Sequence, residues 1–241
     1  MKIKNLLFWV TLYAISMGFL ESAVVIYLRE LLYPAPTGFN FPLKPMHHNL
    51  AIVEVSREAA TIIMLLAVAF LTGKNKAEKL AWFLYSFAIW DIFYYVFLYV
   101  FLGWPQSLFT WDILFLIPVP WTGPVLSPVI IDFEMILFAM TITTYSNKNR
   151  EVKLRIKEQL LLATGALIVI CSFTADYVVM NQAALCRNIA QGCSLLSEMY
   201  NYSPAHFNWY LFSVGSGCIL ISWFIYLSRL KTPGLGPIVP V

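Results

Sequence analysis

Three charged residues lie inside one long apolar stretch of the sequence. Residues 49–71, NLAIVEVSREAATIIMLLAVAFL, contain Glu54, Arg57 and Glu58 in their first half. On a helix these positions share one face, because residues three and four apart are neighbours. Arg57 can therefore neutralise one carboxylate and leave the other for a partner. A charge near the centre of a bilayer costs about 2.5–3.5 kcal/mol, so such residues usually pair or line a cavity.

Most other acidic residues also lie in or beside apolar stretches. Of thirteen Asp and Glu, ten lie away from the loops richest in Lys and Arg: Glu21, Glu30, Glu54, Glu58, Asp91, Asp112, Asp132, Glu134, Asp176 and Glu198. Asp91 is expected near mid-membrane, whereas Glu21 and Glu54 are expected about 8–10 Å below the boundary opposite the basic loops. Asp132 and Glu134 point to different sides of one helix. The pattern predicts a polar cavity that opens outward, with Glu54, Glu58, Asp91, Glu21 and Arg57 as candidate catalytic residues.

Two kinds of chemistry suit these residue types. Carboxylates supplemented by histidine bind iron, manganese or zinc, and the candidate metal ligands are His48, Glu54 and Glu58. The Glu-x-x-His pairs of di-metal bundles are absent from the sequence, which weakens this interpretation. Without a metal, buried carboxylates can act as acid and base on a lipid-soluble substrate such as an isoprenoid or a quinone.

Two alternatives to an enzyme remain open at this point. Intramembrane Asp and Glu are typical of proton or cation transporters, and a path from Glu54 or Glu58 to Asp91 and Asp132 would suit one. A structural subunit of a membrane complex, or a homo-oligomer, would use the same charges as buried ion pairs. A nucleic-acid partner is not expected, because the net charge of +3 carries no basic surface pattern.

The composition requires a membrane environment for the elements that carry these residues. Hydrophobic residues make up 60% of the 241 residues and charged residues 12%, about half the share in soluble domains. We predict an all-α fold: a polytopic membrane protein, in one domain over residues 1–241, with a six-transmembrane-helix bundle. The spans are expected near 6–28, 49–71, 80–102, 121–145, 159–181 and 206–228.

The basic residues predict how these spans are oriented. Twelve Lys and Arg fall at the termini and in the loops on the same side, three fall in the opposite loops, and Arg57 lies within a span. Because basic loops stay in the cytoplasm, both termini are expected to be cytoplasmic, in a bacterial-type inner membrane. Cys186 and Cys193 then lie outside, where they can form a disulfide.

The segment before the fourth span fits this scheme least well. Its apolar run, residues 107–117, is too short to cross a bilayer, and four prolines follow at Pro118, Pro120, Pro124 and Pro128. Proline disfavours a continuous helix. We predict a short re-entrant or interfacial helix over 107–117, with Asp112 near its N-terminus, and a cavity covered by this segment and the 29–48 loop.

Overall fold

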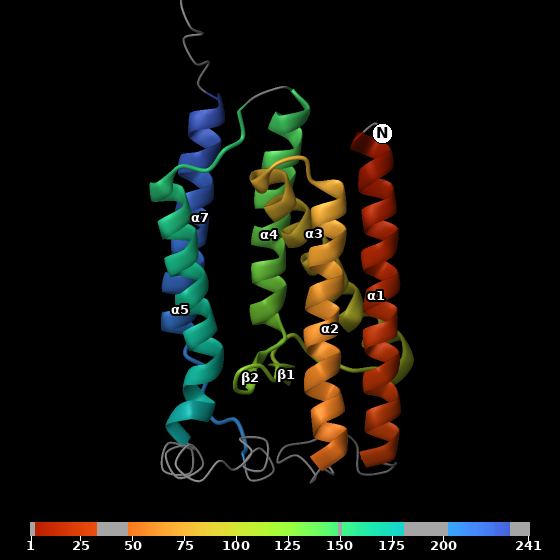
Figure 1. The fold of residues 1–241 in the computed structure, drawn as a ribbon. Coiled ribbons are helices and arrows are strands. Elements are labelled where there is room, and N and C mark those ends of the chain that lie inside the picture. Colours follow the sequence, from red (N-terminus) through yellow and green to blue (C-terminus); the bar gives the residue numbers. More distant parts are fainter. Residues whose placement is uncertain (1–2, 33–47, 149–150, 181–201, 232–241) are drawn as a thin grey trace, which may run out of the picture.

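The computed structural model describes residues 3–32, 48–148, 151–180 and 202–231. The order of elements along the chain is α1 (Ile3–Leu32), α2 (His48–Thr72), α3 (Lys76–Leu102), β1 (Trp111–Phe115), β2 (Trp121–Pro124), α4 (Leu126–Asn147), α5 (Ile156–Met180) and α7 (Trp209–Lys231). The six helices in these ranges are all long and apolar enough to cross a membrane, which confirms the predicted number of candidate spans. The helices run alternately up and down, so the first and last described residues lie at the same end of the bundle (Figure 1).

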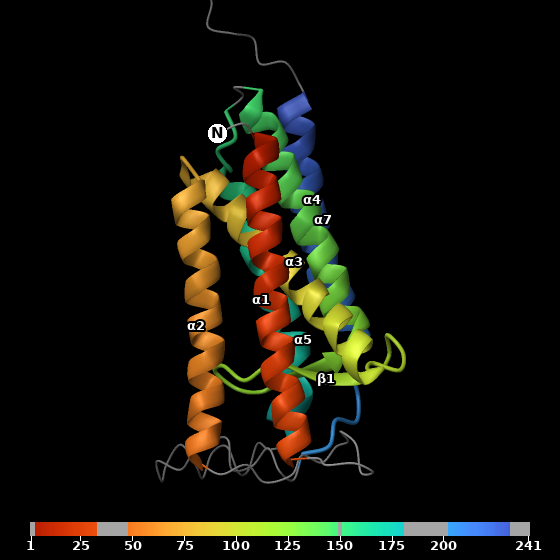
Figure 2. The same cartoon turned by 90° about the vertical axis from the view of Figure 1, so that its right-hand side faces the viewer.

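Helix α3 lies at the centre of the larger part of the bundle. It crosses the other helices at a tilt and packs against α1, α4 and, less extensively, α2 (Figure 2). The closest approach to α1 occurs at Gly18, where a Cβ atom would lie 2.8 Å from the carbonyl oxygen of Trp90. A residue without a side chain is therefore needed for this contact.

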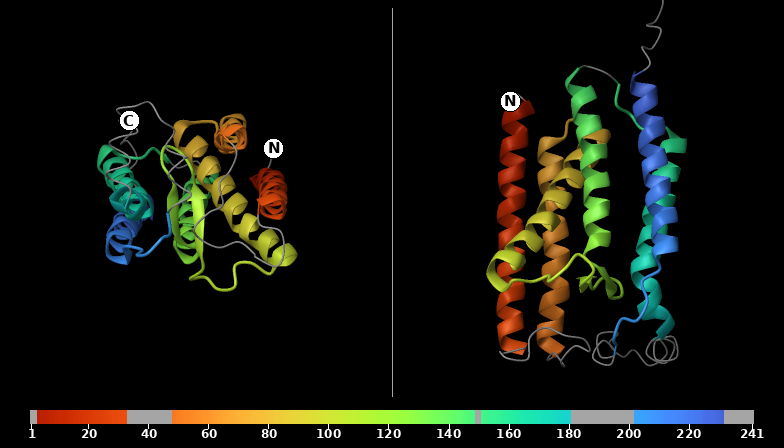
Figure 3. Two further views of the ribbon diagram at one scale, coloured as in Figure 1. Left: turned by 90° about the horizontal axis from the view of Figure 1, so that it is seen from below. Right: turned by 180° about the vertical axis from the view of Figure 1, so that it is seen from behind.

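Helices α5 and α7 form a second, separate pair. Seen from below, this pair lies on one side of α4 and the hairpin, with α1, α2 and α3 on the other side (Figure 3). Gly165 and Gly215 allow the two backbones to meet: a Cβ atom at Gly215 would lie 2.9 Å from the Gly165 carbonyl oxygen. Small residues at helix contacts are typical of membrane bundles. At the end that holds the termini, Arg229 of α7 donates to both carboxylate oxygens of Glu158 in α5, at 2.7 and 2.9 Å.

The predicted helix over residues 107–117 is wrong. Residues 111–115 form β1, which pairs antiparallel with β2 in a two-stranded hairpin. The fourth span consequently begins at Leu126 rather than at 121. Pro118 and Pro120 lie in the loop between the two strands. Helices α5 and α4 pack against β2. Thr122, Gly123 and Pro124 of β2 are consequently buried within the protein.

Candidate functional site

A cavity of about 1010 Å³ lies between the α3–α4 pair and α5. One end is lined by Asn75, Lys76, Glu151 and Lys153, which are exposed to solvent, so the cavity reaches the surface there. The hairpin residues Leu114, Phe115 and Trp121 line the other end. Asn75 and Lys153 lie at the same end of the bundle as the chain termini. This cavity therefore opens at that end, whereas the sequence predicted an opening at the opposite end.

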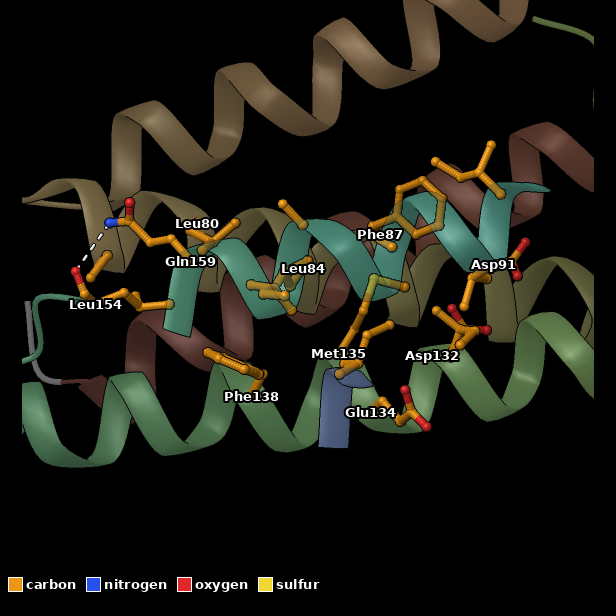
Figure 4. Close-up of a pocket in the computed structure, with 18 of the residues that line it drawn as sticks. Leu80, Leu84, Phe87, Asp91, Asp132, Glu134, Met135, Phe138, Leu154 and Gln159 are labelled. Carbon is orange, nitrogen blue, oxygen red and sulfur yellow. Dashed lines mark hydrogen bonds between the residues drawn. The ribbon is translucent and has the colours of Figure 1, made fainter. Parts of the chain in front are cut away.

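The long wall between the two ends is apolar. Leu80, Leu84 and Phe87 project from α3, and Met135 and Phe138 project from α4 (Figure 4). On the opposite wall α5 contributes leucine, alanine, valine and isoleucine side chains. Near the open end the Gln159 amide donates to the Leu154 carbonyl oxygen at 3.0 Å, so its polar group is already satisfied. The body of the cavity therefore suits the hydrocarbon part of a ligand.

Two carboxyl groups meet at the deep end of this cavity. Asp91 of α3 and Asp132 of α4 lie close together (Figure 4). Two adjacent carboxylates repel each other, so a shared proton or a bound cation stabilises such a pair. Asp91 lies fifteen residues after Lys76, which places the pair about 22 Å from the open end. The length of the apolar wall therefore lies between the pair and this opening.

A third carboxylate, Glu134, lies two residues after Asp132 on α4 and faces α7. One oxygen of Glu134 accepts a hydrogen bond from the Ser216 hydroxyl. Among the described residues, the ion pairs include neither Asp91, Asp132 nor Glu134. The deep end of the cavity therefore carries acidic groups without a Lys or Arg partner in the part of the chain that the structure describes.

Four polar atoms around the deep end are buried without a hydrogen-bond partner among the described residues. No donor of the described residues reaches Asp132 Oδ2 or Glu134 Oε2, and no acceptor reaches the indole Nε1 of Trp90 or Trp121. All four residues line the cavity. Buried polar groups are nearly always hydrogen-bonded, and an unsatisfied one costs about 1–3 kcal/mol. Four such atoms around one cavity indicate a place built for a bound molecule or ordered water.

The other candidate catalytic residues lie in a separate cluster between α1 and α2. Arg57 donates to Glu54 at 2.7 and 3.0 Å and also pairs with Glu21. Thr61 donates to the second oxygen of Glu21 at 3.3 Å. Glu58 takes no part in this network and instead accepts the backbone N–H of Leu116 at 2.9 Å. Of the five predicted catalytic residues, the structure places only Asp91 on the cavity.

Asp112 connects the hairpin to α1 and α3 rather than capping a helix. Its carboxylate accepts from the Tyr95 hydroxyl at 3.2 Å and lies 3.9 Å from the Arg29 guanidinium. Arg29 also stacks over Trp104, 3.9 Å from the ring centroid. Burial raises the pKa of Asp112 to about 6, and the nearby Arg29 opposes this shift. Arg29 of α1 is thus paired with an acidic residue of the hairpin.

The predicted metal site receives no support from the described residues. Within them, no group of three or more His, Cys, Asp and Glu has the spacing of a metal site. Glu54 is occupied by Arg57 and Glu58 by Leu116, whereas the side chain of His48 lies outside the described part, so this ligand set stays a prediction. Cys186, Cys193 and most of the 29–48 loop also lie outside it; Cys171 and Cys218 are free thiols.

Sequence reasoning did not select Glu134, Trp90 or Trp121 as site residues, and it named Asp132 only on the path of a proton transporter. The available signal was depth, because Asp91 and Asp132 both fall in the middle of their predicted spans. Depth alone does not show which helices are neighbours, and that decides the pairing. No protein family, curated protein or solved structure matches the chain. The function of the cavity is therefore inferred from the residues that line it.

Proposed function

We propose that the protein is a multi-pass protein of a bacterial-type inner membrane with both termini in the cytoplasm. Two observations support this. The six apolar helices have the length of membrane spans, and the loops rich in Lys and Arg share one end of the bundle with the termini (Figure 1). Fusions at the C-terminus test the orientation: green fluorescent protein is expected to fluoresce and alkaline phosphatase to be inactive. The reverse pattern would refute it.

We further propose that the cavity binds a lipid-soluble substrate and that the Asp91–Asp132 pair exchanges a proton with it, as in an acid–base enzyme. The observation that carries this proposal is a pair of neighbouring carboxyl groups at the deep end of an apolar cavity. In the donor direction the shared proton passes to the substrate, and one proton from water restores the pair. In the acceptor direction the pair takes one substrate proton and releases one to water. Positioned acid–base groups contribute about 10²–10⁴-fold to a rate.

The first test asks what the protein carries when purified. Organic extracts of the wild type are compared by mass spectrometry with those of Ala166→Trp, which places a large side chain in the cavity, and of Leu167→Trp, which places it on the exposed face of the same helix. A molecule retained by the wild type and Leu167→Trp but lost from Ala166→Trp is the ligand. Equal retention by all three, or by none, contradicts binding in the cavity.

The second test asks whether the bound molecule undergoes proton transfer. The identified ligand is incubated with protein in deuterated water. We expect the wild type to convert it or to incorporate deuterium, and Asp132→Asn to bind it yet react at least about 100-fold more slowly. Equal rates for the two proteins would refute a catalytic role for the pair.

Transport is the second candidate, and one observation favours it. The cavity reaches the surface beside Asn75 and Lys153 and is lined by the hairpin at its other end, the form expected of one state of an alternating-access carrier. A ligand that the wild type binds without converting, and that a pH gradient drives into proteoliposomes, would identify a proton-coupled transporter. That flux should disappear in Asp132→Asn.

A further inference from the structure

The charges at the deep end of the cavity restrict which ligands it can hold. Asp91, Asp132 and Glu134 line this end, while the Lys residues of the lining, Lys76 and Lys153, lie at the surface end about 22 Å away. The two unpartnered carboxyl oxygens belong to different residues, Asp132 and Glu134. Both need a hydrogen-bond donor. A neutral hydroxyl offers one donor, whereas a protonated primary amine offers three and also supplies the missing positive charge.

Aromatic rings surround the same end of the cavity. Phe87 and Trp90 of α3 contact each other edge to face, with ring centroids 5.1 Å apart. On the opposite side Trp121 packs between Phe115 and Phe173, at centroid distances of 5.7 and 6.1 Å. All five rings line the cavity. The faces of such rings attract cations, and Trp attracts them most strongly.

The remaining length of the cavity offers a place for hydrocarbon and no charge. From Leu80 to Phe87 on α3 and from Ala163 to Ile170 on α5, its lining is apolar. A small hydrophilic cation would leave this wall unfilled, and a purely apolar molecule would leave the acidic end unpaired. The complement is therefore an amphiphile with its positive charge at one tip.

We propose that the cavity takes an amphiphilic amine, with its ammonium group beside Asp91 and Asp132 and its apolar body along α3 and α5. This inference rests on the proposed function, because it names the class of molecule that the same cavity binds. An oxygen atom close to the nitrogen would also accept from the indole N–H groups of Trp90 and Trp121, so amino alcohols fit the site better than plain alkylamines.

The test compares probes that share one chain and differ in the head group. Tritiated dodecylamine is titrated into the protein in lipid nanodiscs, with binding to empty nanodiscs subtracted, and dodecanol and dodecanoate are used as competitors. Dodecylamine is expected to bind at least about tenfold more tightly than dodecanol, the size of one charge-assisted hydrogen bond. Dodecanoate is expected not to compete.

Carboxamide variants assign the preference to the cavity. Asp91→Asn and Asp132→Asn should each reduce the preference for amine over alcohol to about twofold or less. Glu30→Gln, which removes an exposed carboxylate outside the cavity lining, should leave it unchanged. If the wild type binds dodecanol as tightly as dodecylamine, or if the amine preference survives in both cavity variants, the inference is overturned while a lipid-binding cavity stands. If no probe binds above empty nanodiscs, the proposed function fails with it.

Discussion

The contact between α5 and α7 permits a prediction with an internal control. A Cβ atom added at Gly215 would lie 2.8 Å from Val169 Cγ2 and 2.9 Å from both the Gly165 carbonyl oxygen and the Val169 backbone nitrogen. Ordinary contacts begin at 3.4 Å, so the helices must separate by about half an ångström. Gly217 lies two residues later on the same helix, and a Cβ atom there would have nothing within 4 Å.

Gly215→Ala is therefore expected to destabilise the protein, and Gly217→Ala is not. Overpacking of a tight contact costs about 1–3 kcal/mol. At about 2–4 °C per kcal/mol for a chain of this size, the midpoint of thermal unfolding should fall by about 2–12 °C. Alanine at position 217 should leave the midpoint unchanged or raise it slightly, because alanine favours helix over glycine by about 0.8–1 kcal/mol.

The assay is thermal unfolding of the three purified proteins in one detergent, followed by tryptophan fluorescence and by loss of the monodisperse peak in size-exclusion chromatography. Both readouts should rank Gly215→Ala below the wild type and Gly217→Ala level with it or above it. Equal midpoints for the two variants would show that the backbones of α5 and α7 do not touch at Gly215, and the position of one cavity wall would have to be revised.

Two further predictions concern the charged groups outside the cavity. Arg57→Met leaves the carboxylates of Glu21 and Glu54 buried without their cation, so it should lower the free energy of unfolding by about 3–5 kcal/mol, measured as reduced thermal stability and yield; an unchanged midpoint would contradict the ion-pair network. Asp112 has a folded pKa of about 6, raised by burial from an ordinary value near 3.8, with Arg29 and Tyr95 beside it. Because the folded state holds its proton more tightly, the stability from this group is complete below about pH 4 and is lost as the pH rises to about 6, a change of about 3 kcal/mol. The difference in stability between wild type and Asp112→Asn should follow that window, and a difference independent of pH would refute the burial argument.

The sequence by itself determined the number of long apolar helices. Six apolar runs of about 20 residues predict six helices, because a helix satisfies all its backbone hydrogen bonds within one segment, as a bilayer requires. The distribution of Lys and Arg likewise indicated which loops share one end, and the alternating helices agree with it (Figure 1). The helix predicted over residues 107–117 was wrong, because a short apolar run suits a strand as well as a helix. Pairing with Trp121–Pro124 decided in favour of the strand.

Only the tertiary structure decided which charged residues meet. Arg57 had acidic neighbours on its own helix, yet the rotation of α2 against α1 gives it Glu21 as well as Glu54 and leaves Glu58 to the Leu116 N–H. In the same way Asp91 was visible in the sequence, but its partner Asp132 depends on the packing of α3 against α4. Spacing along the chain fixes neighbours within one helix, whereas contacts between helices depend on tilt, rotation and order in the bundle. The candidate site consists almost entirely of contacts between helices.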